Sequence, residues 1–167
     1  MEWTVKEGVL HGIYNTQKDL PKEVLSLATV YEGEIPGRVG WNIPFSFLRC
    51  QEDVYSKSLI NTYGKIAEYL VVYSKNDIQT KKHELLHAKY AMDQNYRKKI
   101  HTLWESLIPD DKTRIRNVLC QLHYPDDPEI QLDEFQAYYY TERSSFFGLR
   151  SIHKPHQMIK EKKGKKK

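Results

Sequence analysis

Residues 69–87 read YLVVYSKNDIQTKKHELLH, and this stretch decides the fold that we expect. Its first part is an apolar, β-branched run, which predicts a buried strand over about Ile66–Tyr73. Its second part predicts a helix, because Asp77 or Thr80 can cap the start and no proline or glycine follows before Pro109. The order is a strand followed directly by a long helix.

This helix would place His83 and His87 on one face, because an α-helix has about 3.6 residues per turn. Two imidazoles at this spacing can bind one Zn²⁺ at about 2.0–2.1 Å each. Glu84 would lie beside the open coordination position, where it can accept a proton from water. The alternative is an ordinary amphipathic helix with two surface histidines. The other positions form a polar seam of Lys82, Lys89 and Asp93 and an apolar face of Leu85, Ala88 and Met92, with Lys81 nearer the apolar face.

A catalytic zinc site needs one more protein ligand. The downstream candidates are His101, Glu105, His123, Glu129, Glu134 and Glu142. We favour Glu134, which follows the turn signal Pro125–Pro128 in a short predicted helix that continues to Glu142. Ala137, one turn later, is small enough to let this helix approach the histidine helix. His123 remains the rival ligand, although it also fits the end of a helix.

The two elements together resemble the zincin metallopeptidases of the gluzincin type, in which a later Glu-x-x-Ala element completes the His-Glu-x-x-His site. The resemblance covers the span from about Tyr69 to Glu142. It implies that His83, His87 and Glu134 are zinc ligands and that Glu84 is the general base. It also implies a substrate cleft between the metal-binding helix and an edge strand of a sheet.

Tyr138 lies four residues after Glu134, at the start of a run of three tyrosines. A phenol near a metal can donate a hydrogen bond to an oxyanion, which gives Tyr138 a candidate catalytic role. The alternative is core packing, because tyrosines at this helical position would partly face inward.

The remainder of the chain predicts strands first and helices later. We expect one strand within Trp3–Tyr14 and a helix that starts at Asp19–Pro21 and stops at Gly33. Gly37–Leu48 could contain strands broken at Pro44, which confines that strand to an edge or to its own start. The long helical stretch should break near Asp93–Asn95, and Asp110 or Asp111 could cap a further helix that reaches about His123. This order favours an α+β fold with a small N-terminal sheet packed on the histidine helix and a helical C-terminal part.

Composition sets the limits of function. The chain has 167 residues, of which 40% are hydrophobic and 29% charged, so a core and a solvated surface are both expected. No apolar run is long enough for a membrane span, and the N-terminus does not resemble a signal peptide. Cys50 and Cys120 do not form a disulfide framework, and we interpret them as buried thiols. An intracellular location, cytoplasmic or nuclear, is the simplest expectation.

The C-terminal end is basic. From Lys154 to Lys167 there are seven lysines and one glutamate, a net charge of +6, so the rest of the +4 chain carries about −2. We expect one domain over residues 1–150 and a solvated tail over residues 151–167. The tail could also be a nuclear address or a weak nucleic-acid contact.

The leading functional hypothesis is a zinc-dependent metallopeptidase that acts on a peptide or protein substrate. The alternative is a proteolytically inactive zincin-like protein that binds metal and is tethered to nucleic acid by its lysine tail. The sequence motifs do not choose between these two.

Overall fold

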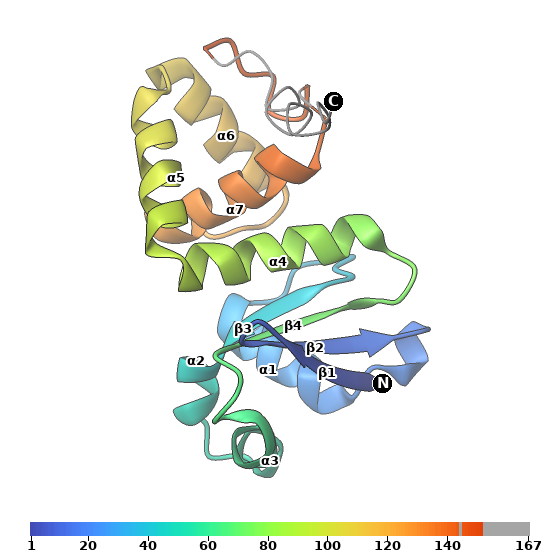
Figure 1. Cartoon of the computed structure of the whole chain (residues 1–167). Coiled ribbons are helices and arrows are strands. Elements are labelled where there is room, and N and C mark those ends of the chain that lie inside the picture. Colours follow the sequence, from blue (N-terminus) through green and yellow to red (C-terminus); the bar gives the residue numbers. More distant parts are fainter. Residues whose placement is uncertain (144, 152–167) are drawn as a thin grey trace, which may run out of the picture. The chain divides into compact units, whose positions relative to one another are not determined.

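The computed structural model describes residues 1–143 and 145–151, and its contacts divide the chain into two compact units, Met1–Lys99 and Ile100–Lys167. Figure 1 shows the sheet in the first unit and the C-terminal helices in the second. The fold class is α+β, as predicted. A single domain over residues 1–150 stays a prediction, and the lysine tail Lys154–Lys167 lies outside the described residues.

The first unit is built on a four-stranded sheet with the order β1-β2-β4-β3. Strands β1 (Glu2–Lys6) and β2 (Val9–Tyr14) are antiparallel, and β2 pairs in parallel with β4 (Tyr69–Ser74). Strand β3 (Trp41–Pro44) pairs antiparallel with β4 and lies at the edge. Pro44 ends an edge strand, as its missing N–H requires. The strand predicted over Ile66–Tyr73 is the central strand β4, although it starts three residues later.

The prediction of one strand within Trp3–Tyr14 is wrong, because the segment folds into a hairpin. Glu7 and Gly8 have φ angles of 52° and 77°. Two consecutive positive φ values form the tight turn that matches the twist of paired strands. Glutamate rarely adopts this conformation, so Gly8 is the only residue of the turn that indicates it.

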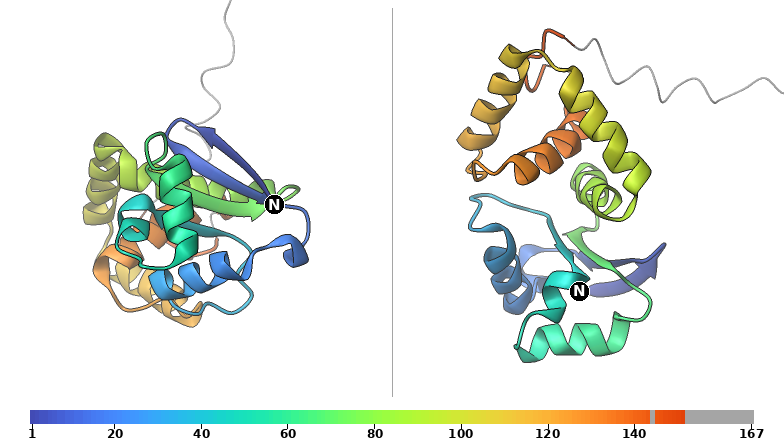
Figure 2. Two further views of the ribbon diagram at one scale, coloured as in Figure 1. Left: turned by 90° about the horizontal axis from the view of Figure 1, so that it is seen from below. Right: turned by 90° about the vertical axis from the view of Figure 1, so that its left-hand side faces the viewer.

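The alternation of β4 side chains divides the first unit into two cores. Leu70 and Val72 face a cluster that includes α1 (Lys22–Glu32), α2 (Phe45–Arg49) and α3 (Val54–Tyr63). Tyr69, Val71 and Tyr73 face the opposite side, where they pack with Ala88 of α4 (Ile78–Met92). Figure 2 shows α4 on one face of the sheet and α1 on the other. The histidine helix therefore packs on the sheet, as predicted.

Helix α4 begins and ends where the sequence indicates. The side chain of Asp77 accepts a hydrogen bond from the Thr80 N–H at 2.9 Å, which caps the first turn. The helix stops at Met92, and Asp93 accepts hydrogen bonds from the N–H groups of Asn95 and Tyr96 at the start of α5 (Gln94–Ser106). The predicted break near Asp93 is confirmed.

Helix α1 is also confirmed, with Pro21 before its first residue and Gly33 after its last. Two other expectations are wrong. Phe45–Leu48 belongs to helix α2 rather than to a strand, because Pro44 ends the pairing of β3 with β4. Cys50 and Cys120 are exposed thiols, because each lies at the solvent-facing end of a helix rather than in a core.

The second unit contains the rest of α5 with α6 (Pro109–Gln121) and α7 (Pro128–Thr141). Ile108, not Asp110 or Asp111, is the N-cap of α6, since Pro109 already occupies the first helical position. Asp127 caps α7 by accepting from the N–H groups of Glu129 and Ile130, so the predicted turn leads into the predicted helix. Among the described residues, no helix is both long and apolar enough to cross a membrane.

Asp111 is fully buried and ties the last described residues to α6. Its carboxylate accepts hydrogen bonds from the N–H groups of Arg150 and Ser151, at 2.9 and 2.7 Å, and from the Ser151 hydroxyl. Burial by itself raises the pKa of Asp111, but these hydrogen bonds, with the charge of Arg114, outweigh it and lower the pKa below its ordinary value of 3.8. The carboxylate form therefore stabilises the fold.

We expect Asp111→Asn to lower the free energy of unfolding by roughly 1–3 kcal/mol at neutral pH, because an amide cannot accept all of these hydrogen bonds. Since the folded-state pKa is depressed, the stabilisation is present above pH 3.8 and is lost as the pH falls through the lower folded-state value. Urea unfolding followed by circular dichroism measures both effects. Asp110→Asn, an exposed change in the same helical turn, is the control, and an equal loss in both variants would contradict the role of Asp111.

Candidate metal centre

The two histidines lie on one face of α4, as their spacing predicts. The centroids of the His83 and His87 rings are 4.9 Å apart, with an angle of 69° between the ring planes. His87 is 1% exposed and His83 is half-buried. Two rings this close on one helix can direct a nitrogen each toward a common point.

Glu84 is buried on α4 and is held by the edge strand β3. The Asn42 amide nitrogen donates a hydrogen bond to Glu84 Oε2 at 3.1 Å. The Tyr69 hydroxyl donates to Asn42 Oδ1 at 2.7 Å. Because the tyrosine occupies the amide oxygen, the amide must present its nitrogen to the carboxylate. The chain Tyr69–Asn42–Glu84 therefore fixes both the position of the glutamate and the orientation of its partner.

Gly40 allows this close approach of β3 and α4. A Cβ atom at Gly40 would overlap Glu84 Oε1 and the methyl group of Thr80. Glycine is therefore required here for space, since its φ angle is not in the left-handed region.

Tyr14 adds a neutral hydroxyl near this carboxylate. Its hydroxyl donates to the Val39 carbonyl oxygen at 2.5 Å. Burial, and then the negative charges of Asp77 and Glu84, raise the pKa of Tyr14. Tyr14 thus stays protonated at neutral pH and serves as a structural donor that holds the segment leading into β3.

Glu134 comes from α7, whose packing is well defined. Phe135 is fully buried, with its ring centroid 5.3 Å from that of Trp104 and 5.7 Å from that of Phe147. Glu134 is 4% exposed, and Ala137, one turn later, is fully buried. The small residue that the sequence places after Glu134 is therefore in a close-packed position.

His83, His87 and Glu134 form a group that could hold a metal ion. One ligand atom from each of the three lies within 4.8 Å of the other two. Two imidazoles and a carboxylate are the donor set of many metal sites. The group contains the three predicted ligands.

The rival ligand His123 is not a member of this group. It follows the end of α6 with a φ angle of 69°, and its N–H donates to the Cys120 carbonyl oxygen at 3.0 Å. A left-handed residue here is typical of helix termination. The alternative interpretation of His123 as a helix-end residue matches this position.

Tyr138 packs among aromatic residues of its own unit. Its ring stacks on Phe146 with 5.0 Å between the centroids, and its hydroxyl lies 3.1 Å from that of Tyr124. These contacts agree with the core-packing alternative, and a catalytic role for Tyr138 stays a prediction.

Sequence reasoning missed Gly40, Asn42 and Tyr69 as parts of the site. Gly40 and Asn42 lie in the Gly- and Pro-rich segment before α2, where no spacing pattern connects them to α4. Their role depends on the pairing of β3 with β4, which brings Asn42 opposite Val71. The one sequence-based expectation that concerns this segment is that an edge strand of the sheet borders the metal-binding helix.

The chain matches no protein-family model, no curated protein and no solved structure. The likeness to gluzincins therefore rests on the two motifs alone.

We expect the purified protein to bind one divalent metal ion per chain and His87→Ala to lose it, because a remaining imidazole and carboxylate form a much weaker site. The variant should also lose any stabilisation that bound metal gives the folded state. Elemental analysis after dialysis, with thermal unfolding at fixed metal concentration, measures both. His123→Ala is the matched control. Full metal retention by His87→Ala would show that the metal binds elsewhere. Loss of metal in His123→Ala, with retention in Glu134→Ala, would show that His123 and not Glu134 is the third ligand.

Proposed function

We propose that the protein is a zinc-dependent metallopeptidase that hydrolyses peptide bonds, with His83, His87 and Glu134 as ligands and Glu84 as general base. The observation that carries the proposal is the hydrogen bond from Asn42 to Glu84, which holds a buried carboxylate beside the histidine pair. Burying a carboxylate costs free energy, so a buried glutamate between two histidines is unusual in a helix that has only a structural role. The burial of Glu84 under β3 supports a chemical role for it.

The donor set favours zinc. Imidazole suits zinc, and two histidines with one carboxylate leave a coordination position for water or substrate. When bound, the ion would polarise a scissile carbonyl and lower the pKa of a water molecule toward ~7. The ligands themselves are held by rigid elements, since both histidines lie within α4 and Glu134 lies within α7.

Glu84 would move the proton. Its carboxylate would accept a proton from the attacking water and then give it to the leaving amine. The hydrogen bond from Asn42 occupies Oε2, and Oε1 lies in the space left by Gly40. One oxygen thus anchors the carboxylate, and the proposed mechanism assigns the proton to the other.

The edge strand β3 supports an extended peptide as the substrate. The Phe45 N–H donates to the Glu68 carbonyl oxygen at 2.9 Å, which fixes the alternation of the β3–β4 ladder. By that alternation, the backbone groups of Ile43 face β4 and those of Asn42 face outward. A peptide laid along this edge could hydrogen-bond to the backbone of the same residue that holds Glu84.

We expect Glu84→Gln to keep the metal and to lose at least about a hundredfold in hydrolysis, the usual contribution of a general base. Glutamine can still accept from Asn42 but cannot take a proton at neutral pH. The wild type must first show chelator-sensitive cleavage of a peptide library. Wild-type rates in the variant would remove Glu84 from the mechanism. No cleavage by the wild type, with metal bound, would favour the inactive zincin-like alternative.

We expect Gly40→Ala to lower hydrolysis while metal content is kept, because the new methyl group would displace the Glu84 carboxylate and not the histidines. Overpacking of this kind costs roughly 1–3 kcal/mol of stability, so circular dichroism must show that the variant is folded. Val39→Ala, at a neighbouring side chain that is 40% exposed, is the control. Unchanged turnover in Gly40→Ala would mean that the placement of Glu84 is not needed for the reaction.

A further inference from the structure

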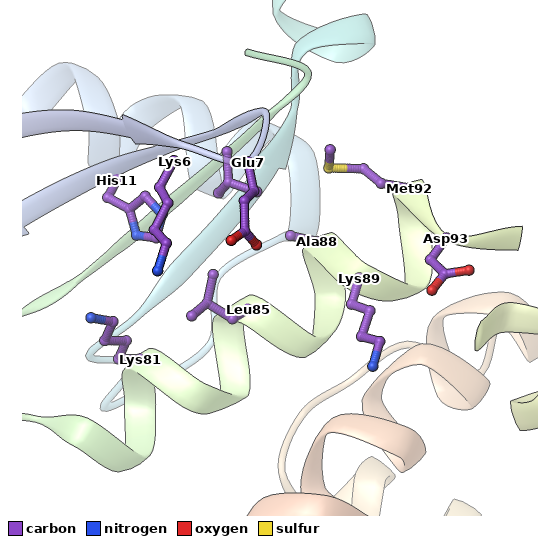
Figure 3. Close-up of a pocket in the computed structure, with 10 residues that line it drawn as sticks. Lys6, Glu7, His11, Lys81, Leu85, Ala88, Lys89, Met92 and Asp93 are labelled. Carbon is purple, nitrogen blue, oxygen red and sulfur yellow. The ribbon is translucent and has the colours of Figure 1, made fainter. Parts of the chain in front are cut away.

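A cavity of about 510 Å³ is lined only by residues of the unit Met1–Lys99. It opens between the β1–β2 hairpin and α4, on the face of α4 that carries Leu85 and Ala88 rather than the histidines (Figure 3). Its apolar floor consists of Val9, Leu85, Ala88 and Met92. The proposed hydrolysis gives this cavity no role, so its chemistry can be considered separately.

One end of the cavity is cationic. We call Lys6, His11 and Lys81 the cationic end, and Figure 3 shows both lysine side chains beside the imidazole. Burial lowers the pKa of His11, and the positive charges of Lys81 and Lys6 lower it further. The same charges that disfavour a protonated imidazole would favour an anion next to it.

The two lysines of the cationic end are both exposed side chains. Within the described residues, neither Lys6 nor Lys81 takes part in an ion pair. Lys81 is exposed, and its Nζ lies 5.3 Å from the centroid of the Tyr73 ring, which places the ammonium group over the sheet. The position of Lys81 near the apolar face of α4, unusual in sequence terms, is explained by this place at the rim of the cavity.

His11 is oriented by the sheet. It is 6% exposed, and its Nδ1 lies 3.0 Å from the Tyr73 hydroxyl. When Tyr73 donates to Nδ1, the hydrogen of the neutral imidazole is on Nε2, which can then donate to a ligand. The cationic end thus combines two lysine ammonium groups with one ring donor whose orientation is fixed by Tyr73.

The other end of the cavity carries one charge of each sign, Asp93 and Lys89. Asp93 caps α5 through Asn95 and Tyr96. Lys89 Nζ lies 4.4 Å from the centroid of the Tyr96 ring. With Glu7 of the hairpin turn, the lining holds three lysines and two carboxylates, and the cationic end is the part that contains two of the lysines and no carboxylate.

We propose that this cavity binds a small organic anion, a carboxylate with an apolar body, whose charged group contacts the cationic end and whose body covers the apolar floor. The volume is adequate for a medium-chain carboxylate, and pockets of this kind combine an apolar lining with a few placed polar groups. An inorganic anion would leave the floor exposed to water, and a neutral hydrocarbon would leave the lysines unused.

The test uses the full-length protein and the fluorescence of anilinonaphthalenesulfonate, an anion with an aromatic body. Octanoate should displace the dye, whereas acetate, which lacks the body, and octanol, which lacks the charge, should displace it much less. Displacement by octanol at the same concentration as octanoate would overturn the proposal, because the cationic end would then contribute nothing.

Variants locate the binding. Lys6→Gln and Lys81→Gln should each weaken octanoate binding by about threefold, the usual scale for an exposed charge contact. The matched control is Lys82→Gln, which changes an exposed neighbour on the same helix that does not line the cavity. Equal affinity in all three variants would place the dye elsewhere and overturn the proposal. No step of this test depends on metal content or on hydrolysis, so it can fail or succeed independently of the proposed function.

Discussion

The packing of α4 on one face of β4 is the constraint on which the rest of the structure depends. Val71, which is fully buried, faces Ala88, and the small alanine allows the helix to lie close to the sheet. Burial of this apolar contact fixes the rotation of α4 about its own axis. Once that rotation is set, the face of the helix on which each other side chain lies is also set.

Two chemically different surfaces follow from this rotation. On the side of the edge strand, Glu84 meets Asn42, and the absence of a side chain at Gly40 makes room for it. On the side of the β1–β2 hairpin, Lys81 lies with His11 and Lys6 in the lining of the cavity, beside its apolar floor. The same helix thus presents a carboxylate to one strand and a cation to another. A shift of α4 along the sheet would disturb both.

The proposed peptidase chemistry depends on rigidity more than on any unusual residue. A histidine pair on a helix is common, and a glutamate between them is useful only if it is held. The hydrogen bonds from Tyr69 to Asn42 and from Asn42 to Glu84 connect the central strand, the edge strand and the helix in one buried line. Such a line fixes a geometry because each amide and hydroxyl has one arrangement that satisfies all three groups.

Local signals in the sequence determined the helix caps at Asp77 and Asp127, the strand at Tyr69–Ser74, the break at Asp93 and the shared face of His83 and His87. These depend on spacing and on neighbours in the chain, so residues close in sequence were sufficient. Tertiary structure alone decided the group of His83, His87 and Glu134, the partnership of Asn42 with Glu84, and the cavity beside Lys81. Each of these joins segments far apart in sequence, and strand pairing and helix packing, which no local pattern encodes, bring such segments together.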